Sequence, residues 1–512
     1  MRKSSILVAL LGIVLGVLLT VNVQLFLKNR KIKRVGYDNW RKISLILETI
    51  DNNYVDTVDR EKVSDAVAAA ALSALDPHSV YMLPQRLEDS EAELAGNFDG
   101  IGIQFNVPND TATVIEVIPG GPSEKIGLQA GDRIVKVDDL NIAGVKYPID
   151  SISRKIKGKA GSKVLITVKR GQEIIPFEIT RGKIPTHSVD ASFMVNDTTG
   201  YIRLSKFSRT TYREVAASSL DLLANGMKDL VLDLRDNSGG FLDQALQVAN
   251  LFLEKDQMIV YMEGLHRKRE DFKADGKGFM KTTGLKVLVN EGSASSSEIL
   301  AGALQDNGRA TIIGRRSFGK GLVQEPIYFS DGSGMRITVA RFYSPSGRCI
   351  QKPYSDDYDY EVIRRYNEGE MVVADSMKVE KGGILPDVFV PMDTTKAGRF
   401  YVGCNRKATT MRFASAFFDR NKASIAPIED YGELISYLDS ADLEREFLAF
   451  ARQKDGLAPT AAEWQIEKPY LMTQVRALIG RYSKLGDNSY YHIYLQIDET
   501  FNAALKQGKP QS

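Results

Sequence analysis

The stretch Asp229-Leu-Val-Leu-Asp-Leu-Arg-Asp-Asn-Ser-Gly-Gly240 decides the fold of this 512-residue chain. Its beginning is rich in apolar residues, as in a buried strand, and its paired glycines mark a turn into a helix over 241–252. Further strands are expected at 199–204, 285–289 and 310–314, and further helices at 212–225 and 298–305. Strands that alternate with helices indicate an α/β layer architecture between residues 184 and 391.

The rest of the chain shows three other patterns. Apolar residues at three- and four-residue steps predict helix over 37–74, which ends at Asp76-Pro77 because the residue before proline avoids the helical region. Short strands and glycine turns, with one helix at 148–156, predict a compact β-rich module over 96–181. From 393 onward the sequence is mostly helical and charged, with 431–451 and 468–485 as the best helices. We therefore expect five parts, which are an N-terminal membrane anchor with its flanks at 1–34, a helical region at 35–94, a β-rich module at 95–183, an α/β core at 184–392 and a helical region of unassigned role at 393–512.

Composition and spacing argue against several classes of function. The chain has 43% apolar and 26% charged residues, and its net charge of +2 gives no case for binding nucleic acid. Its four histidines lack the spacing of a metal site, so neither a metal nor another cofactor is expected. The two cysteines, Cys349 and Cys404, form no CxxC pair, which favours two unrelated thiols and leaves a disulfide open.

The N-terminus predicts a membrane anchor. Residues 6–27 carry no charge and are long enough, at about 1.5 Å per residue, to cross a hydrocarbon core of roughly 30 Å. An uncleaved anchor is favoured over a cleaved signal peptide, because no small-x-small cleavage site stands near the end of the segment. The segment is flanked by Arg2 and Lys3 before it and by five basic residues within 28–34 after it. This bias alone would place the body of the protein in the cytoplasm.

Asn290-Glu-Gly-Ser-Ala-Ser-Ser-Ser-Glu298 places a serine at a predicted helix start. Ser295 precedes Glu298 by three residues, which is typical of a capping box, and capping serines greatly outnumber nucleophilic ones. The same position also suits catalysis, because free N–H groups at a helix start can stabilise an oxyanion. Ser295 is therefore a candidate nucleophile, and the backbone N–H of Ser296 is a candidate oxyanion donor.

Gly314-Arg-Arg-Ser-Phe-Gly-Lys-Gly321 looks at first like a phosphate-binding loop. Gly321 stands where that motif needs Ser or Thr, and the next residues predict a strand, so nucleotide binding is not expected. The flanking glycines instead let Lys320 approach another segment. A neutral lysine can take the proton of a serine, and Gln324, on the same face of an extended chain, is placed to hold the amine. These residues predict a Ser/Lys hydrolase that uses Ser295 and Lys320.

Two glycine-containing turns supply further candidates. The glycines that end the opening stretch make a turn and also expose backbone N–H groups, with Gly239 the better candidate for a second oxyanion donor. Asp99-Gly-Ile-Gly-Ile103 precedes a predicted strand in the β-rich module. Such a loop can capture the terminal carboxylate of a peptide while the strand edge pairs with the peptide. The candidate binding residues are Gly100, Ile101, Gly102 and Ile103.

Taken together, these residues resemble the C-terminal processing peptidases, which are serine endopeptidases that carry a PDZ domain. The resemblance spans roughly residues 40–392. Its motifs, in the order of the family, are Leu75-Asp-Pro-His-Ser79, Gly127-Leu-Gln-Ala-Gly-Asp-Arg-Ile134, Leu234-Arg-Asp-Asn-Ser-Gly-Gly240, Ser293-Ala-Ser-Ser-Ser-Glu298, Gly319-Lys-Gly-Leu-Val-Gln324 and Ser344-Pro-Ser-Gly-Arg-Cys-Ile-Gln351.

The resemblance implies a multidomain α/β protein with a crotonase- and Clp-protease-like core, an inserted PDZ domain at 95–183, an N-terminal transmembrane helix and helical terminal regions. It implies that Ser295 is the nucleophile, Lys320 the general base and Gln324 the residue that orients the lysine. The PDZ domain would recognise protein substrates with unstructured, apolar C-termini. The body would lie in a bacterial periplasm, held at the inner membrane by residues 6–27 in spite of the charge bias, and a homo-oligomer stays open.

Two departures from the family pattern and two alternatives accompany this hypothesis. Ser296 stands where alanine is common, and Val137-Asp-Asp-Leu140 stands where an Asn-Gly turn is more usual. The competing hypothesis is a membrane-tethered PDZ scaffold with an inactive hydrolase core, and the presence of Ser295, Lys320 and Gln324 argues against it. A dehydratase-type crotonase enzyme would share the fold but leave the serine motif and the PDZ domain without a purpose.

Overall fold

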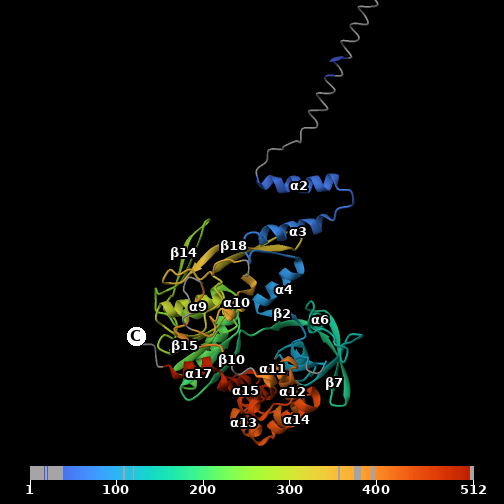
Figure 1. Cartoon of the computed structure of the whole chain (residues 1–512), viewed down its shortest axis with the longest axis vertical. Helices are drawn as coiled ribbons and strands as arrows, with labels where there is room; N and C mark the ends of the chain where they lie inside the picture. The colour runs from blue at the N-terminus through green and yellow to red at the C-terminus, as the bar shows by residue number, and fades with distance from the viewer. Residues whose placement is uncertain are drawn as a thin grey trace, which may run out of the picture. The chain divides into compact units, whose positions relative to one another are not determined.

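The structure is a computed structural model (Figure 1). It describes residues 16, 17, 20, 39–107, 110–118, 120–355, 358–373, 382–393 and 398–507. The chain forms one compact unit at Met1–Ala71 and a second at Leu72–Ser512. Helices α2 (Asn39–Asn53) and α3 (Arg60–Ser73) occupy the region that the sequence predicts as helical, with a break between them.

The predicted membrane anchor at 6–27 lies outside the described residues, apart from residues 16, 17 and 20. Within the part of the chain that is described, no helix has the length and apolar character needed to cross a bilayer. The anchor therefore stays a prediction from the sequence.

A six-stranded sheet forms the centre of the second unit, in the order β10-β11-β12-β15-β16-β19. All neighbouring pairs are parallel except β10 and β11. The strands are β10 (Val189–Met194), β11 (Thr199–Leu204), β12 (Asp229–Asp233), β15 (Gly284–Val289), β16 (Thr311–Gly314) and β19 (Val388–Phe389), and helices α7 (Thr211–Ala224), α8 (Leu242–Asn250) and α9 (Ser296–Asp306) connect them. The predicted alternation of strands and helices is confirmed.

Both faces of this sheet are covered, which explains the apolar run in β12. Leu230 and Leu232 point into one core, which includes residues of α7, α8 and α9. Val231 points to the other face, where it packs in a cluster with Phe501 near the C-terminus. Because side chains alternate along a strand, a strand buried on both sides needs apolar residues at successive positions.

A second, antiparallel sheet was not predicted. It has the order β1-β18-β13-β14, and β17 pairs with β18. Its strands are β1 (Val80–Met82), β13 (Met258–Gly264), β14 (Arg267–Lys273), β17 (Leu322–Tyr328) and β18 (Gly334–Tyr343). Strand β14 has the sequence Arg-Lys-Arg-Glu-Asp-Phe-Lys and is almost wholly exposed, so it lacks the apolar alternation by which a strand is recognised.

The β-rich module folds around its own core as the sheet β3-β4-β5-β7-β8, with the short strand β6 beside β5. Its elements are β3 (Ile103–Asn106), β4 (Ala112–Val117), α5 (Pro122–Lys125), β5 (Arg133–Val137), β6 (Leu140–Asn141), α6 (Ile149–Ile156), β7 (Lys163–Arg170) and β8 (Glu173–Thr180). Strands β2 (Asn97–Gly100) and β9 (Gly182–Pro185) pair with each other and close the two ends of the module. An insertion closed in this way can fold as a separate layer.

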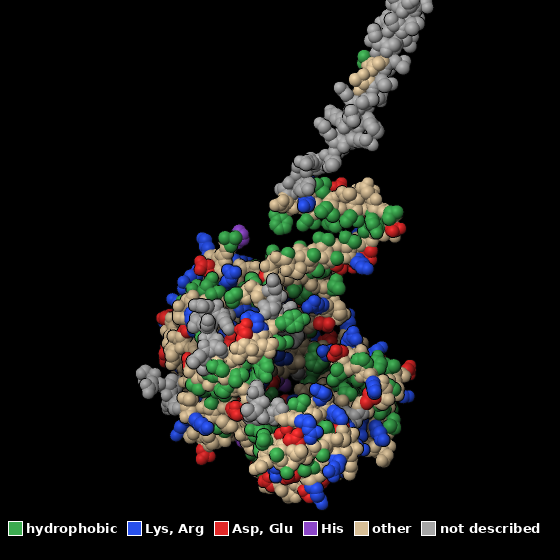
Figure 2. All heavy atoms as spheres, in the orientation of Figure 1, with side chains coloured by type: hydrophobic (Ala, Val, Ile, Leu, Met, Phe, Trp, Pro, Cys, Tyr) green, Lys and Arg blue, Asp and Glu red, His purple; other side chains and the backbone are tan. Residues whose placement is uncertain are grey.

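The C-terminal region is helical, as predicted (Figure 1). Its helices are α11 (Arg399–Arg406), α12 (Thr409–Ile425), α13 (Tyr431–Ser440), α14 (Leu443–Asp455), α15 (Ala461–Gly480), α16 (Asp487–Tyr494) and α17 (Glu499–Lys506). The helix predicted at 431–451 is two helices, because Ala441 has an extended backbone. The helix predicted at 468–485 begins earlier, at a capping box formed by Thr460 and Glu463. Figure 2 shows basic and acidic side chains interspersed on the visible face.

Candidate active site

Ser295 occupies a strained turn between β15 and α9. Its backbone has φ 55° and ψ −115°, a conformation that residues with a side chain rarely adopt. Backbone strain of this kind costs about 1–3 kcal/mol and persists only where the surrounding structure imposes it. The turn places Ser295 at the start of α9, as predicted, with its side chain partly exposed beside a helix that is buried from Ser296 to Leu304.

Glu298 connects the serine to the lysine. Its Oε2 accepts the backbone N–H of Ser295 at 2.8 Å and that of Lys320 at 2.8 Å. Its Oε1 accepts the hydroxyl of Ser317 at 2.5 Å and the N–H of Gly319 at 2.6 Å. Burial raises the pKa of Glu298, and these four hydrogen bonds oppose the rise only in part. The sequence predicted only that Glu298 caps its own helix. Its hydrogen bonds to Gly319 and Lys320 connect that helix to a distant loop, which a local motif does not predict.

Lys320 lies in surroundings that favour its neutral form. Burial is the main cause that lowers its pKa, the positive charge of Arg336 lowers it further, and Glu298 and Asp76 oppose this. Its amine has no hydrogen-bond partner within the described ranges, and no hydrogen bond joins it to the hydroxyl of Ser295 there. Catalytic hydrogen bonds are often long in enzymes without substrate. The structure therefore brings the two backbones together at one carboxylate without pairing their side chains.

The glycines around Lys320 allow the close approach that the sequence suggested. A Cβ atom on Gly321 would lie 2.5 Å from the backbone nitrogen of Gln351, and one on Gly319 would lie 3.0 Å from Cβ of Lys352. The residues that follow form the strand β17, as the sequence predicts. The loop is thus packed tightly against the segment at residues 350–352.

Gly239 packs directly against the serine turn. A Cβ atom on Gly239 would lie 2.7 Å from Cβ of Ser295 and 3.0 Å from the nitrogen of Ser296. The N–H of Gly239, however, donates to Oδ1 of Asn237 at 2.9 Å. In the described part of the chain, the N–H groups of Gly240 and Ser296 have no acceptor. The role of Gly239 as an oxyanion donor stays a prediction, and it requires that its bond to Asn237 be exchanged.

Gln324 does not reach Lys320 in this structure. Its amide nitrogen donates to the backbone carbonyl of His78, which belongs to the motif at 75–79. The ring of His78 shares a hydrogen bond of 2.6 Å with the hydroxyl of Tyr358. Nε2 of Gln351, at the end of the motif 344–351, donates weakly to the same hydroxyl at 3.4 Å, and its Oε1 accepts the N–H of Gly321 at 3.0 Å. Two motifs with no role in the sequence analysis thus meet at the segment that carries the lysine.

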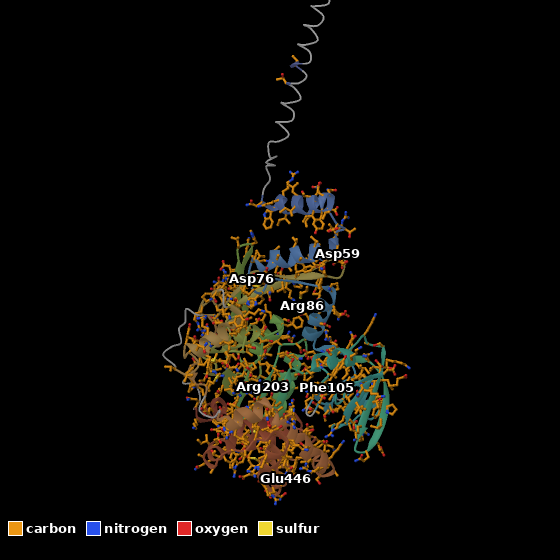
Figure 3. All side chains as sticks on the ribbon, turned by 45° about the vertical axis from the view of Figure 1, so that its right-hand side comes forward. Asp59, Asp76, Arg86, Phe105, Arg203 and Glu446 are labelled. Carbon is orange, nitrogen blue, oxygen red and sulfur yellow. The ribbon has the colours of Figure 1, made fainter. Side chains whose placement is uncertain are left out.

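Asp76, which is labelled in Figure 3, fixes the backbone of the motif at 75–79. Its carboxylate accepts the N–H groups of His78 and Ser79 at 2.8 Å each and the hydroxyl of Ser79 at 2.7 Å. Burial alone would raise the pKa of Asp76, but these hydrogen bonds outweigh it and lower the pKa. A negative charge therefore remains near Lys320 and limits the fall of the lysine pKa.

The candidate peptide loop of the β-rich module precedes an open strand edge. Gly100 ends β2, and Ile103 begins β3, with Ile101 buried between them and Gly102 at φ 80°. The carbonyls of Ile101 and Gly102 accept the N–H groups of Ser123 and Ile118 at 3.0 Å. Among the described strands, β3 pairs with β4 alone, so its second edge is available to another strand.

No group of three or more His, Cys, Asp or Glu side chains that could hold a metal occurs within the described ranges. The two cysteines are both free, Cys349 at the surface and Cys404 buried. The site therefore consists of the serine turn, the lysine loop and the turn at Gly239.

Family models and known proteins match parts of this chain. The family model of peptidase family S41 matches residues 198–362, and that of the PDZ domain matches residues 113–170. A "Probable CtpA-like serine protease" of Staphylococcus haemolyticus (strain JCSC1435) is 33% identical over 316 residues, which is 60% of this chain and 62% of the relative. The corresponding protein of Staphylococcus aureus (strain COL) is 33% identical over 343 residues, 66% of this chain and 68% of the relative.

A solved structure, "Photosystem II D1 C-terminal processing protease", is 29% identical, with 69% of this chain and 87% of that chain covered and a TM-score of 0.40. The chain belongs to peptidase family S41, among the CtpA-like serine proteases, and contains a PDZ domain. It matches less than two thirds of the length of the Staphylococcus haemolyticus relative.

Proposed function

We propose that this protein is a serine endopeptidase that uses Ser295 and Lys320 as a catalytic pair. The observation that carries the proposal is the carboxylate of Glu298, which binds the backbone of both residues and so fixes the nucleophile beside a lysine whose pKa is lowered. A lysine that is neutral near physiological pH can act as a general base. Ser295 supplies a partly exposed hydroxyl, and Lys320 supplies an amine whose pKa is lowered by burial.

The chemistry follows from these positions. Neutral Lys320 takes the proton of the Ser295 hydroxyl as the oxygen attacks the peptide carbonyl, which leaves a negative charge on the carbonyl oxygen. The N–H of Ser296 at the helix start, with an N–H of the turn at Gly239 and Gly240, stabilises that charge. The lysine then returns its proton to the leaving amine. Water, deprotonated in the same way, releases the acyl group from the serine.

Gln324 enters this mechanism through a rearrangement. Its amide now donates to the carbonyl of His78, so it must turn to accept from the amine of Lys320 when substrate binds. Gln324 lies near the start of β17, four residues after Lys320, at a register shift between Val323 and Gln324.

The PDZ domain supplies substrate recognition in this proposal. The open edge of β3 can take an extended peptide as an added strand, and the N–H groups of Gly100, Ile101, Gly102 and Ile103 would bind its terminal carboxylate. A peptide that enters an apolar module in this way carries apolar residues at alternate positions. We further propose a crotonase-like core and an anchor at residues 6–27 that holds the body in the periplasm.

The full chain, purified in mild detergent, tests the proposal. Wild type, Ser295→Ala and Lys320→Ala are incubated with an unfolded protein that ends in apolar residues, and with the same protein ending in charged residues. We expect cleavage by wild type alone and faster cleavage of the apolar form. Equal cleavage by all three proteins would disprove the site. Peptide binding without cleavage by wild type would favour the scaffold.

A further inference from the structure

The turn between β12 and Gly240 depends on a buried arginine. The guanidinium of Arg235 binds Asp233 through Nε at 2.9 Å and through Nη2 at 2.6 Å. Asp233 is completely buried and also accepts the hydroxyl of Tyr201 at 2.8 Å and an ion pair from Arg203 at 3.2 Å. Arg203 lies over the ring of Tyr491 in the C-terminal region, with Cζ 5.5 Å from the ring centroid. The turn thus begins in a cluster of buried charges.

Asp498, from the C-terminal region, completes this cluster. Its Oδ2 accepts a hydrogen bond from Nη1 of Arg235 at 2.7 Å, on the side of the guanidinium that Asp233 leaves open. Its Oδ1 accepts the N–H of Phe501 at 2.8 Å and so caps helix α17. Phe501 packs against the outer face of the central sheet. One carboxylate therefore fixes both the start of α17 and the free end of Arg235.

Asp498 supplies a negative charge that the Arg235 guanidinium needs. Arg203 and Arg235 carry two positive charges, and Asp233 and Asp498 carry two negative ones, with side chains of all four at most 14% exposed. Arg203 has a further, exposed partner in Asp236 at 3.7 Å, whereas Asp498 is the partner of Nη1 of Arg235. The loss of Asp498 therefore leaves this end of the Arg235 guanidinium without a counter-charge. An uncompensated buried charge forces its surroundings to rearrange or to admit water.

Such a rearrangement reaches the catalytic turn within two residues. Asn237 follows Arg235 closely, and its side chain accepts the N–H of Gly239. Its backbone carbonyl accepts the N–H of Ala294 at 2.9 Å and the hydroxyl of Ser297 at 2.9 Å, which lie on either side of Ser295 and Ser296. Any movement of Arg235 along this chain changes the spacing between the serine and the oxyanion donors.

We propose that Asp498 is a positioning residue for peptide cleavage, through which the C-terminal region holds the turn at residues 234–240 in register with Ser295. This inference rests on the proposed peptidase function. It assigns a catalytic purpose to a region for which the sequence suggested none. Asp498 touches no substrate and acts only through Arg235.

The substitution Asp498→Asn tests this role, because asparagine still caps a helix but places an amide rather than a carboxylate against Arg235. We expect kcat on an unfolded protein substrate to fall about tenfold with KM changed less than twofold, since the oxyanion donors and not the binding surface are displaced. Asp498→Glu keeps the charge and should recover more than half of the lost activity. Unchanged kcat in Asp498→Asn, when wild type is active, overturns the inference alone.

Asp455→Asn is the matched control. Asp455 forms a partly buried ion pair with Arg412 at 2.7 Å inside the C-terminal region and does not contact the turn. The substitution Asp455→Asn should lower the melting temperature at least as much as Asp498→Asn does, while kcat stays within twofold of wild type. An equal loss of kcat in both variants would mean that Asp498 only stabilises the region.

Hydrogen–deuterium exchange gives a readout that needs no activity. Amides at 234–240 should exchange faster in Asp498→Asn than in wild type and remain unchanged in Asp455→Asn. If wild type cleaves nothing, the proposed function fails, and the exchange result still decides whether Asp498 holds the turn. If the amides at 234–240 exchange equally fast in wild type and in Asp498→Asn, the positioning role is overturned.

Discussion

At the scale of single residues, Glu298 accepts more hydrogen bonds than the capping of one helix requires. Four donors meet its two oxygens, and two of them are the backbone N–H groups of Ser295 and Lys320. A carboxylate accepts at several lone pairs at once, whereas an amide has one accepting oxygen. The relative position of the backbones of Ser295 and Lys320 therefore depends on Glu298.

Glu298→Gln should damage stability and activity together. In the glutamine variant, the amide NH2 replaces one carboxylate oxygen, so the two donors that this oxygen bound lose their acceptor. Each buried donor without an acceptor costs about 1–3 kcal/mol of stability. We expect the free energy of unfolding to fall by about 2–6 kcal/mol in urea denaturation, with a loss of kcat. Glu463→Gln is a matched control, since Glu463 also accepts the N–H of its capping residue, Thr460, but lies away from the site. A normal kcat in Glu298→Gln would refute the linking role.

The pH profile should report the pKa of Lys320. Since only the neutral amine is a base, kcat/KM rises with pH, and its midpoint should lie below the ordinary value of 10.5 because burial lowers the pKa. The unfolded chain binds more protons between the two pKa values, so the destabilisation due to Lys320 weakens as pH rises and is gone above about 10.5. A midpoint at or above 10.5 would contradict the assignment. Lys320→Arg, which stays charged, should be inactive over the whole range.

At the scale of elements, the lysine loop is fixed by what lies behind it. Gly319 and Gly321 press against residues 350–352, and Gln351 accepts the N–H of Gly321. The motif at 75–79 contacts the other side through the carbonyl of His78. Two segments distant in sequence, 75–79 and 350–352, thus meet at the lysine loop and the start of β17.

Gly321→Ala should displace the loop. Its Cβ would lie 2.5 Å from the nitrogen of Gln351, closer than any relaxed contact, and backbone cannot move aside as a side chain can. We expect a loss of about 1–3 kcal/mol in stability and a clear fall of kcat in the same preparation. Gly403→Ala serves as control, because its Cβ would meet only the flexible side chain of Leu457 at 3.1 Å. Full activity in Gly321→Ala would show that the loop tolerates this shift.

The sequence predicted the elements whose pattern is local. Apolar strands such as β12, the helix start at Ser295 and the glycines around Lys320 each have a signal within a few residues. Contacts between distant segments have no such signal. The bond from Gln324 to His78 and the exposed, highly charged strand β14 depend on tertiary pairing, so periodicity could not reveal them.

At the scale of the whole molecule, the C-terminal region packs against the α/β core and also contacts the PDZ domain. Leu495, Phe501 and Ala504 cover the outer face of the central sheet. The ion pair between Arg133 and Asp419 joins the same region to the PDZ domain. The helices therefore touch both the module that would bind substrate and the core that would cleave it.

A chain that ends at residue 392 should not give a soluble core. The loss of the C-terminal region uncovers the face of the sheet that carries Tyr201, Val231 and Leu288. A large exposed apolar patch leads to aggregation. We expect it in the insoluble fraction on expression, measured by sedimentation. A chain that ends at residue 507 keeps α17 and should remain soluble and active. A monodisperse, folded product from the shorter chain would show that the core is independent.

The left-handed backbone of Ser295 also bears on how such enzymes evolve. Glycine adopts φ 55° freely, whereas alanine retains the strain of about 1–3 kcal/mol. A dead enzyme with Ser295→Gly should therefore withstand heat better than the active protein, and Ser295→Ala should not. Selection for activity thus keeps the chain below the thermal limit of its own fold, and a lineage released from that selection has an immediate route to greater robustness.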